Sequence, residues 1–277
     1  MARLLAPPGD ESETLDAAGR RGHSAPMTDL HRFQSFDGVS IGYRTLGDPA
    51  GWPTVMLHGF LASAESNWFL PGIAAVVAAM GRRVIAPDLR GHGRSDAPSD
   101  LAAWPPDVLA RDQEALVAHL HLKDYDLIGY SLGARTAVRM LARGARPRKL
   151  VLGGMGDRGL MAAGARAAMF EDAIRHGDAA RDPRAGRRVQ AMMAAGGLKP
   201  EAMLGVLASF LATSAETIAA IDVPTLVAAG QRDDDNGSIE ALAAMMADAR
   251  AVRVPGDHLS AVMEPALAAA IVGFLEG

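Results

Sequence analysis

The pentapeptide GYSLG at residues 129–133 constrains the fold more than any other stretch of the sequence. It follows the apolar run 126–128, which is typical of a buried strand, and precedes 134–141, which has helical periodicity and good helix formers. A serine on a sharp turn between a strand and a helix adopts a strained backbone, and small residues two positions on either side let the helix fold back on the strand. The two glycines supply that space, so we expect the Ser131 hydroxyl to stand clear of a sheet edge.

Short apolar runs alternate with helical segments along most of the chain. The strands are expected at 54–57, 83–86, 126–128, 149–152, 224–230 and 251–254, and the helices at 63–80, 105–120, 134–141, 238–247 and 259–275. The strands are continuously apolar, which predicts a parallel sheet covered on both faces. Residues 31–47 alternate apolar and polar side chains around Asp37-Gly38, which indicates a hairpin. We therefore expect an α/β fold with about eight strands, mostly parallel and doubly wound, with an N-terminal antiparallel hairpin.

The strand–helix rhythm breaks at residues 158–220, where only helical signals occur. We expect this segment to be a small helical cap or lid inserted after the sixth strand, with the core formed by 27–157 and 221–277. A doubly wound sheet binds ligands at the carboxyl ends of its strands, and the cap should cover that crevice. Residues 1–26 are rich in Gly, Pro, Ala and charge, which favours a disordered leader.

Composition excludes several function classes. The net charge of −4 gives no basic excess for nucleic acid or an anionic membrane, and no cysteine is available for a disulfide, a thiolate metal site or a Cys nucleophile. No apolar run approaches the roughly 18 residues that span a bilayer. We expect a small-molecule substrate, no nucleic-acid or membrane partner, no metal, no cofactor and a cytoplasmic location.

A serine nucleophile needs a base and an acid that orients the base. His258 directly follows the last strand and is the best candidate for the base, whereas His58 and His92 lie in loops that precede Ser131. The order Ser…Asp…His is the order that this kind of architecture uses.

The acid should follow a strand that lies between the serine and the histidine. Asp233 comes first after the strand-end turn and is favoured over its neighbour Asp234. Asp157, which follows the preceding strand, is the fallback. Two backbone N–H groups would bind an oxyanion, one from Leu132 and the other from Phe60, where Gly59 lets the backbone approach a ligand.

These stretches resemble the motifs of the α/β-hydrolase fold family. They are 57–60 (oxyanion loop), 88–95 (loop after the fourth strand), 129–133 (nucleophile elbow), 230–233 (acid turn) and 256–258 (histidine loop). They occur in family order, and the resemblance covers about residues 30–277. It implies Ser131, Asp233 and His258 as the catalytic triad, with Phe60 and Leu132 as oxyanion donors, and a mainly structural role for 88–95.

The default reaction for such a site is hydrolysis of a carboxylic ester through an acyl-enzyme. Methionines in the cap favour an adaptable apolar pocket. The residues expected to line this pocket are His58, Gly59, Trp68, Tyr130, Met155 and Leu259. The cap also carries arginines that are either solvated or bind a substrate carboxylate: Arg158, Arg166, Arg175, Arg181, Arg184, Arg187 and Arg188.

The leading hypothesis is a carboxylesterase for small to medium, apolar esters. Residues 129–135 are also similar to the elbow of the menaquinone-pathway synthase that eliminates pyruvate, and to that of carbon–carbon bond hydrolases, except that Ala134 stands where those enzymes commonly have Gly. A third hypothesis is a non-catalytic, ligand-binding relative, against which the complete set of catalytic residues argues.

Overall fold

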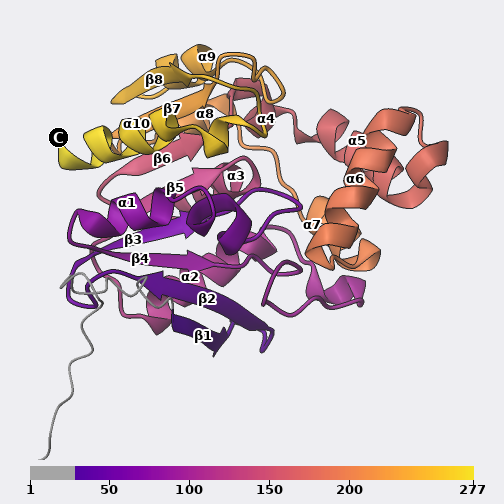
Figure 1. The fold of residues 1–277 in the computed structure, drawn as a ribbon, viewed down its shortest axis with the longest axis horizontal. Coiled ribbons are helices and arrows are strands. Elements are labelled where there is room, and N and C mark those ends of the chain that lie inside the picture. The colour runs from indigo at the N-terminus through magenta and orange to yellow at the C-terminus, as the bar shows by residue number, and fades with distance from the viewer. Residues whose placement is uncertain (1–28) are drawn as a thin grey trace, which may run out of the picture.

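An eight-stranded sheet forms the centre of the computed structural model, which describes residues 29–277 (Figure 1). Its strands are β1 (Asp29–Gln34), β2 (Ser40–Leu46), β3 (Trp52–Leu57), β4 (Arg82–Pro87), β5 (Asp126–Tyr130), β6 (Leu150–Gly153), β7 (Thr225–Gly230) and β8 (Ala249–Val254). They lie in the order β1-β2-β4-β3-β5-β6-β7-β8. The leader expected at residues 1–26 lies outside the described residues.

The sheet is parallel except at its N-terminal edge. β1 pairs with β2 and β2 pairs with β4 in antiparallel register, whereas all other pairs are parallel. Strand β3 lies between two partners, with Val55 opposite Ile85 of β4 and Leu127 of β5. The predicted mostly parallel sheet of eight strands with an antiparallel hairpin is therefore confirmed.

Helices cover both faces of the sheet because its strands are apolar on both sides. Helices α1 (Ile73–Ala79) and α10 (Pro265–Glu276) pack on one face, against residues such as Ile128. Helices α2 (Val108–His119), α3 (Leu132–Ala142) and α9 (Ile239–Ala244) pack on the other, against residues such as Leu127. Among residues 29–277, no helix is both long and apolar enough to cross a bilayer. The cytoplasmic location stays a prediction.

Two helices differ from their predicted bounds for reasons of backbone chemistry. The stretch 63–80 is divided into a π-helical turn (Glu65–Phe69) and α1, because Gly72 between them has a left-handed φ of 81°. The helix expected at 259–275 begins only at Pro265, after a 3₁₀ turn at Ala261–Met263. Proline lacks an N–H and has its φ preset for a first helical position, so it starts this helix rather than interrupting it.

A helical insertion (residues 157–219) separates β6 from β7. It contains α4 (Asp157–Met161), α5 (Ala163–His176), a 3₁₀ turn (Gly177–Ala179), α6 (Pro183–Gly196), α7 (Pro200–Ala208) and α8 (Ala215–Ala219). In Figure 1, α5, α6 and α7 stand beyond the ends to which the arrowheads of the parallel strands point. The insertion therefore lies at the sheet edge where the candidate residues converge.

Arg90 joins the loop after β4 to two distant segments. Its buried guanidinium donates to Asp37 in the hairpin turn (2.7 and 2.8 Å) and to Asp112 on α2 (2.7 and 2.9 Å). Asp112 is fully buried and also accepts a hydrogen bond from Ser35. The loop 88–95 is thus held by one fully buried charge pair, Arg90–Asp112, and by a second pair, Arg90–Asp37, that is partly exposed.

Replacing Asp112 with Ala should leave Arg90 buried with one carboxylate fewer. We expect the free energy of unfolding to fall by about 3–5 kcal/mol in urea titration, the range for a broken buried pair. The matched control is Glu171→Ala, because Glu171 pairs with Arg175 on the surface with both side chains half-exposed; it should cost less than about 1 kcal/mol. Equal losses in the two variants would contradict a structural role for the buried pair.

Candidate active site

Ser131 occupies the turn between β5 and α3 with a left-handed backbone (φ 51°, ψ −106°). A Cβ on Gly129 would lie 2.3 Å from the Gly133 carbonyl oxygen, and a Cβ on Gly133 would lie 2.0 Å from the Leu57 carbonyl oxygen. Such distances are far below van der Waals contact, so both positions require glycine. The turn is held further by the Ser131 N–H, which donates to the Gly153 carbonyl (2.7 Å).

Three side chains far apart in the sequence form a continuous hydrogen-bonded chain. The Ser131 Oγ lies 3.0 Å from His258 Nε2, and His258 Nδ1 lies 2.9 Å from Asp233 Oδ2. Asp233 is 3% exposed and His258 8% exposed, so water competes little for these bonds. Because a carboxylate accepts the Nδ1 proton, Nε2 is left free to accept the proton of the serine hydroxyl.

The other two candidate acids do not contact His258. The Asp234 side chain is largely exposed, and its carboxylate lies 3.9 Å from Arg253. Asp157 instead accepts a hydrogen bond from the Ser238 N–H (2.8 Å) and so holds the start of α9. Of the three aspartates weighed from the sequence, Asp233 alone is hydrogen-bonded to the histidine.

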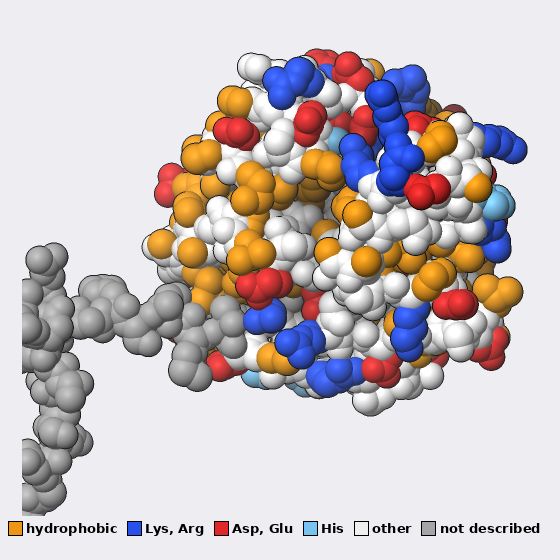
Figure 2. All heavy atoms as spheres, turned by 45° about the vertical axis from the view of Figure 1, so that its right-hand side comes forward, with side chains coloured by type: hydrophobic (Ala, Val, Ile, Leu, Met, Phe, Trp, Pro, Cys, Tyr) orange, Lys and Arg blue, Asp and Glu red, His pale blue; other side chains and the backbone are white. Residues whose placement is uncertain are grey.

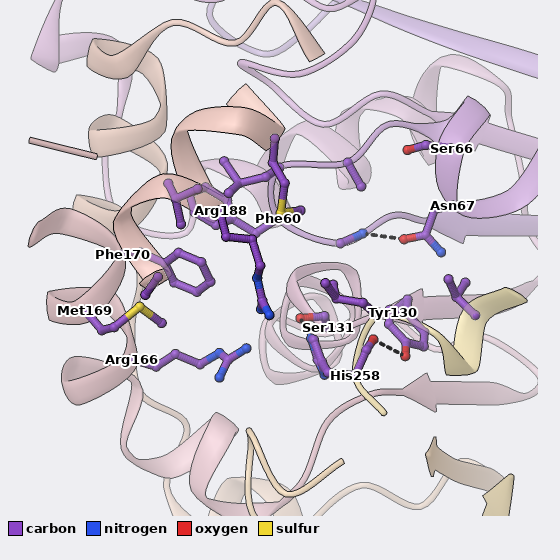
Figure 3. Close-up of a pocket in the computed structure, with 18 residues that line it drawn as sticks. Phe60, Ser66, Asn67, Tyr130, Ser131, Arg166, Met169, Phe170, Arg188 and His258 are labelled. Carbon is purple, nitrogen blue, oxygen red and sulfur yellow. Dashed lines mark hydrogen bonds between the residues drawn. The ribbon is translucent and has the colours of Figure 1, made fainter. Parts of the chain in front are cut away.

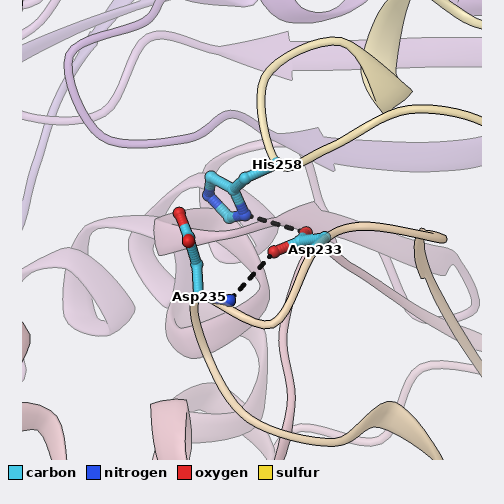
Figure 4. Close-up of side chains that lie close together, drawn as sticks. All are labelled: Asp233, Asp235 and His258. Atoms are coloured by element: carbon cyan, nitrogen blue, oxygen red, sulfur yellow. Dashed lines mark hydrogen bonds and ion pairs between the residues drawn. The ribbon is translucent and has the colours of Figure 1, made fainter.

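Asp235 lies next to this histidine on its other side (Figure 4). Its oxygen, one from Asp233 and a His258 nitrogen all lie within 4.8 Å of one another, which is a spacing a metal could use. Each group already has a partner, however: Asp235 pairs with Arg166 (2.9 Å), and both ring nitrogens of His258 are engaged. A cation would have to displace these bonds, so we propose no metal here.

Two residues that line the cavities beside Ser131, Phe60 and Leu132, have backbone N–H groups without a partner in the described part of the chain. Across residues 29–277, neither the Phe60 nor the Leu132 N–H makes a hydrogen bond, and Leu132 begins α3, where N–H groups are left unpaired. The neighbouring Gly59 N–H donates to the Asn67 side chain (2.9 Å), which holds the loop. Sequence reasoning missed Asn67, because a lone Asn in an apparently helical stretch carries no pattern.

Tyr130, the last residue of β5, positions the loop that carries His258. Its hydroxyl donates to the His258 carbonyl oxygen (2.8 Å), and burial raises the pKa of this phenol. Tyr130 therefore stays a donor across the physiological range.

His58 braces the loop after β3 and does not line either cavity beside Ser131. It is fully buried, accepts from the Leu89 N–H at Nε2 (2.9 Å) and donates from Nδ1 to the Gly59 carbonyl (2.8 Å). Burial lowers its pKa to about 4. Trp68 also lies outside the cavities, because it is buried in the core on the α1 face. His58 and Trp68, which we expect from the sequence to line the substrate pocket, therefore do not line either cavity beside Ser131.

A cavity of about 140 Å³ opens above Ser131 and His258, and Figure 3 shows it between the sheet edge and the helical insertion. Gly59, Tyr130 and Leu259 are among the residues that line it. Its apolar walls are Phe60, Leu61, Met169, Phe170, Val189, Met192 and Val262. On this face, Figure 2 shows hydrophobic side chains gathered around a hollow.

Two arginines of the insertion point toward the site from α5 and α6 (Figure 3). Arg166 is paired with Asp235, and Arg188 is exposed at the cavity wall. A second cavity, of about 40 Å³, shares Phe60 and Ser131 with the first and is also lined by Met155. Met155 thus lies near the serine but in the smaller space.

Because two imidazoles are buried, we expect the free energy of unfolding to fall in acid. Burial lowers the pKa of His58 to about 4 and that of His92, 5.1 Å away between ring centres, to about 3. Below about pH 6.5 these histidines are protonated in the unfolded chain but stay neutral in the folded protein. Each histidine should therefore lower the free energy of unfolding by up to about 1.4 kcal/mol per pH unit, until the pH reaches its pKa in the folded protein.

We therefore expect His92→Asn to reduce the slope of the free energy of unfolding against pH, between pH 6 and 4.5, by about 1.4 kcal/mol per pH unit. Urea titrations at several pH values measure this slope. The exposed His121 supplies the control, since His121→Asn should leave the slope as in the wild type. An unchanged slope in His92→Asn would show that the buried imidazole is not kept neutral.

Comparisons with known proteins agree with this geometry. A family model described as the alpha/beta hydrolase fold matches residues 53–155. The chain is 39% identical over 107 residues to a non-heme chloroperoxidase of Streptomyces lividans, a match covering 39% of this chain and 37% of that protein. It is 37% identical over 129 residues to the 2-hydroxymuconate semialdehyde hydrolase of Pseudomonas sp. (strain CF600), covering 44% and 43%. The chain thus spans about two fifths of the length of these relatives.

The structural match extends over more of the molecule. The esterase RhEst1 from Rhodococcus sp. ECU1013 superposes with a TM-score of 0.70 and 24% identity, covering 90% of this chain and 98% of that one. Sheet order, the turn at Ser131 and these matches agree: the protein has the α/β-hydrolase fold, and its residues 53–155 match the model of that family.

Proposed function

We propose that this protein is a serine hydrolase that cleaves small to medium, largely apolar carboxylic esters. The observation that carries the proposal is the hydrogen-bonded chain Ser131–His258–Asp233 at the floor of an apolar cavity. Serine is the nucleophile, histidine the base and Asp233 the orienting acid. The unpartnered N–H groups of Phe60 and Leu132 complete the site as oxyanion donors.

The reaction follows from these positions. The Ser131 Oγ attacks the ester carbonyl carbon while His258 Nε2 takes its proton, and the carbonyl oxygen becomes an oxyanion bound by the two N–H groups. The imidazolium then gives its proton to the leaving alcohol as the C–O bond breaks. Water, deprotonated by the same nitrogen, attacks the acyl-serine; the C–Oγ bond then breaks, the acid is released, and the imidazolium returns the proton to Ser131 Oγ. Asp233 remains ionised throughout and holds the tautomer.

The helical insertion supplies much of the cavity wall and is proposed to act as a cap. Phe170 comes from α5, and Val189 and Met192 come from α6, so a substrate would be enclosed between these helices and the sheet edge. A cavity of about 150 Å³ accommodates one benzene molecule. The observed 140 Å³ therefore favours an ester with one short-chain or single-ring group.

A second candidate keeps the site and changes the bond that is broken. The chain resembles a 2-hydroxymuconate semialdehyde hydrolase over 129 residues, and the elbow resembles those of carbon–carbon bond hydrolases and the pyruvate-eliminating synthase. The same oxyanion donors could polarise a ketone. The likeness to a solved esterase is one of fold and does not decide between the two candidates. A purely ligand-binding role is disfavoured because all the catalytic groups are within hydrogen-bonding distance.

A series of p-nitrophenyl esters from acetate to decanoate tests the ester hypothesis. We expect the highest kcat/KM for short and medium chains, because the cavity is small. Ser131→Ala and His258→Ala should each lower kcat by several orders of magnitude. Short esters that turn over no faster with wild type than with Ser131→Ala would exclude an esterase, and turnover of 2-hydroxymuconate semialdehyde would then favour the second candidate.

The three aspartates can be separated by isosteric substitution. Asp233→Asn should lower kcat by about 10⁴-fold, because the amide favours the wrong histidine tautomer. Asp234→Asn is the matched control, next in the chain but exposed, and should change kcat less than about twofold. Asp157→Asn should lower stability more than rate. A silent Asp233→Asn with a loss in either other variant would reassign the acid.

A further inference from the structure

Arg135 is exceptional among the buried arginines of the described chain. Three arginines in residues 29–277 are buried: Arg82, Arg90 and Arg135. The first two pair with aspartates, Arg82 with Asp126 and Arg90 with Asp37 and Asp112. Arg135 forms no ion pair with any residue from 29 to 277, although it is only 8% exposed.

The neutral contacts of Arg135 do not replace a counter-ion. Its Nη2 donates to the Gly159 carbonyl oxygen, and its guanidinium lies 5.0 Å from the centre of the Phe210 ring. Its Nη1 is buried without a hydrogen-bond partner. Burial and the nearby Arg139 lower the pKa of Arg135 to about 10, so it remains charged at neutral pH. An unpaired charge out of water is costly, which calls for an anion that the chain does not itself supply.

Arg139, one turn further along the same helix, shows the arrangement that Arg135 lacks. It holds Asp107 with two hydrogen bonds of 2.7 and 2.8 Å. Helix α3 therefore carries Arg139, which is paired with an aspartate of the protein, and Arg135, which has no such partner among the described residues and borders an open space.

Arg135 borders two small cavities, one of about 20 Å³ that Asp107 and Arg139 also line, and one of about 40 Å³ beside the serine. Of the two, only the cavity of about 40 Å³ is lined by Ser131. Arg135, Ser131 and Leu132 all line it, and Arg135 follows the serine by one helical turn. His258, which would protonate the leaving alcohol, lines the larger cavity and not this one. The alcohol part of an ester would accordingly lie in the larger cavity and the acyl part in the smaller, toward Arg135.

We propose that the smaller cavity binds a carboxylate at the far end of a short acyl chain, with Arg135 as its counter-ion. The inference rests on the proposed function for the orientation of the ester. It narrows the substrate class to half-esters of short dicarboxylic acids. A planar guanidinium pairs well with a carboxylate, because two parallel N–H groups match its two oxygens.

Arg166 and Arg188 are the competing cations. Arg166 already has Asp235 as partner, and Arg188 is exposed, where water screens its charge. Arg166 lines both cavities, whereas Arg188 lines only the larger one. If Arg188 bound the carboxylate, the carboxylate would lie on the alcohol side of the ester. Binding by Arg135 and binding by Arg188 can therefore be distinguished, because a different arginine variant would lose carboxylate binding in each case.

Calorimetry on the Ser131→Ala protein tests the proposal without turnover. Monomethyl succinate carries one carboxylate and dimethyl succinate none, and we expect the former to bind at least tenfold more tightly. Adding Arg135→Met should abolish this preference, whereas adding Arg188→Met should preserve it. A preference that survives Arg135→Met, that is lost in Arg188→Met, or that is absent from Ser131→Ala would overturn the proposal.

If Arg135→Met does not fold, a second variant tests whether the smaller cavity binds the carboxylate. Ala167 lines only the smaller cavity, and Ala167→Phe should fill it while leaving the charge in place. We expect this variant, in the Ser131→Ala background, to lose the preference for monomethyl succinate; a retained preference would place the carboxylate elsewhere and overturn the proposal.

The wild-type enzyme separates this proposal from the proposed function. If it hydrolyses methyl butyrate as fast as monomethyl succinate, the esterase stands and the carboxylate subsite fails. If it hydrolyses neither ester while the Arg135-dependent binding preference is present, the ester hypothesis fails and the anion site stands.

Discussion

The close approach of helix α3 to strands β3 and β5 is the constraint on which the whole site depends. Gly133 lies against the Leu57 carbonyl and Gly129 against the backbone of Gly133, at distances that leave no room for a side chain. This contact forces the left-handed backbone of Ser131 and lifts its hydroxyl above the sheet edge. It also brings the start of α3 beside the loop after β3, so Leu132 and Phe60 line the same small cavity.

Buried charged side chains around this turn occur in two arrangements. Most buried arginines are paired with aspartates and stabilise connections between segments, as Arg90 does between the hairpin and α2. In the site, a buried aspartate is paired with a histidine that contacts the serine, and one arginine is left with no carboxylate of its own. We interpret the first arrangement as structural and the second as functional, since an uncompensated buried charge destabilises a fold unless a ligand pairs with it.

The sequence predicted the sheet well and the details of the site less well. Strands were found because each is a continuous apolar run, and Ser131, His258 and the aspartate run stood out because each follows a strand. Asp233 was favoured over Asp234 on position alone; which carboxylate points inward depends on the turn that Arg253 holds through the Gly230 and Asp233 carbonyls. His58 was misplaced because burial behind a loop leaves no local pattern.

Other features could not have been read from one sequence. The cavity arises where the insertion meets the sheet edge, and the contacts that build it join residues more than thirty positions apart, such as Phe60 and Phe170. Arg135 was visible only as part of the elbow, because the absence of a partner is a property of three-dimensional packing. Gly72 and Pro265 could have refined the helix bounds, since both residue types commonly mark helix starts and breaks.

We propose that Ser131 is a nucleophile activated by His258. The most direct test is covalent trapping by diethyl p-nitrophenyl phosphate, followed by mass spectrometry of the intact protein and its peptides. We expect one diethylphosphoryl group per chain on Ser131, formed much more slowly in His258→Ala and absent from Ser131→Ala. Labelling of another residue, or equal labelling rates in wild type and His258→Ala, would contradict it.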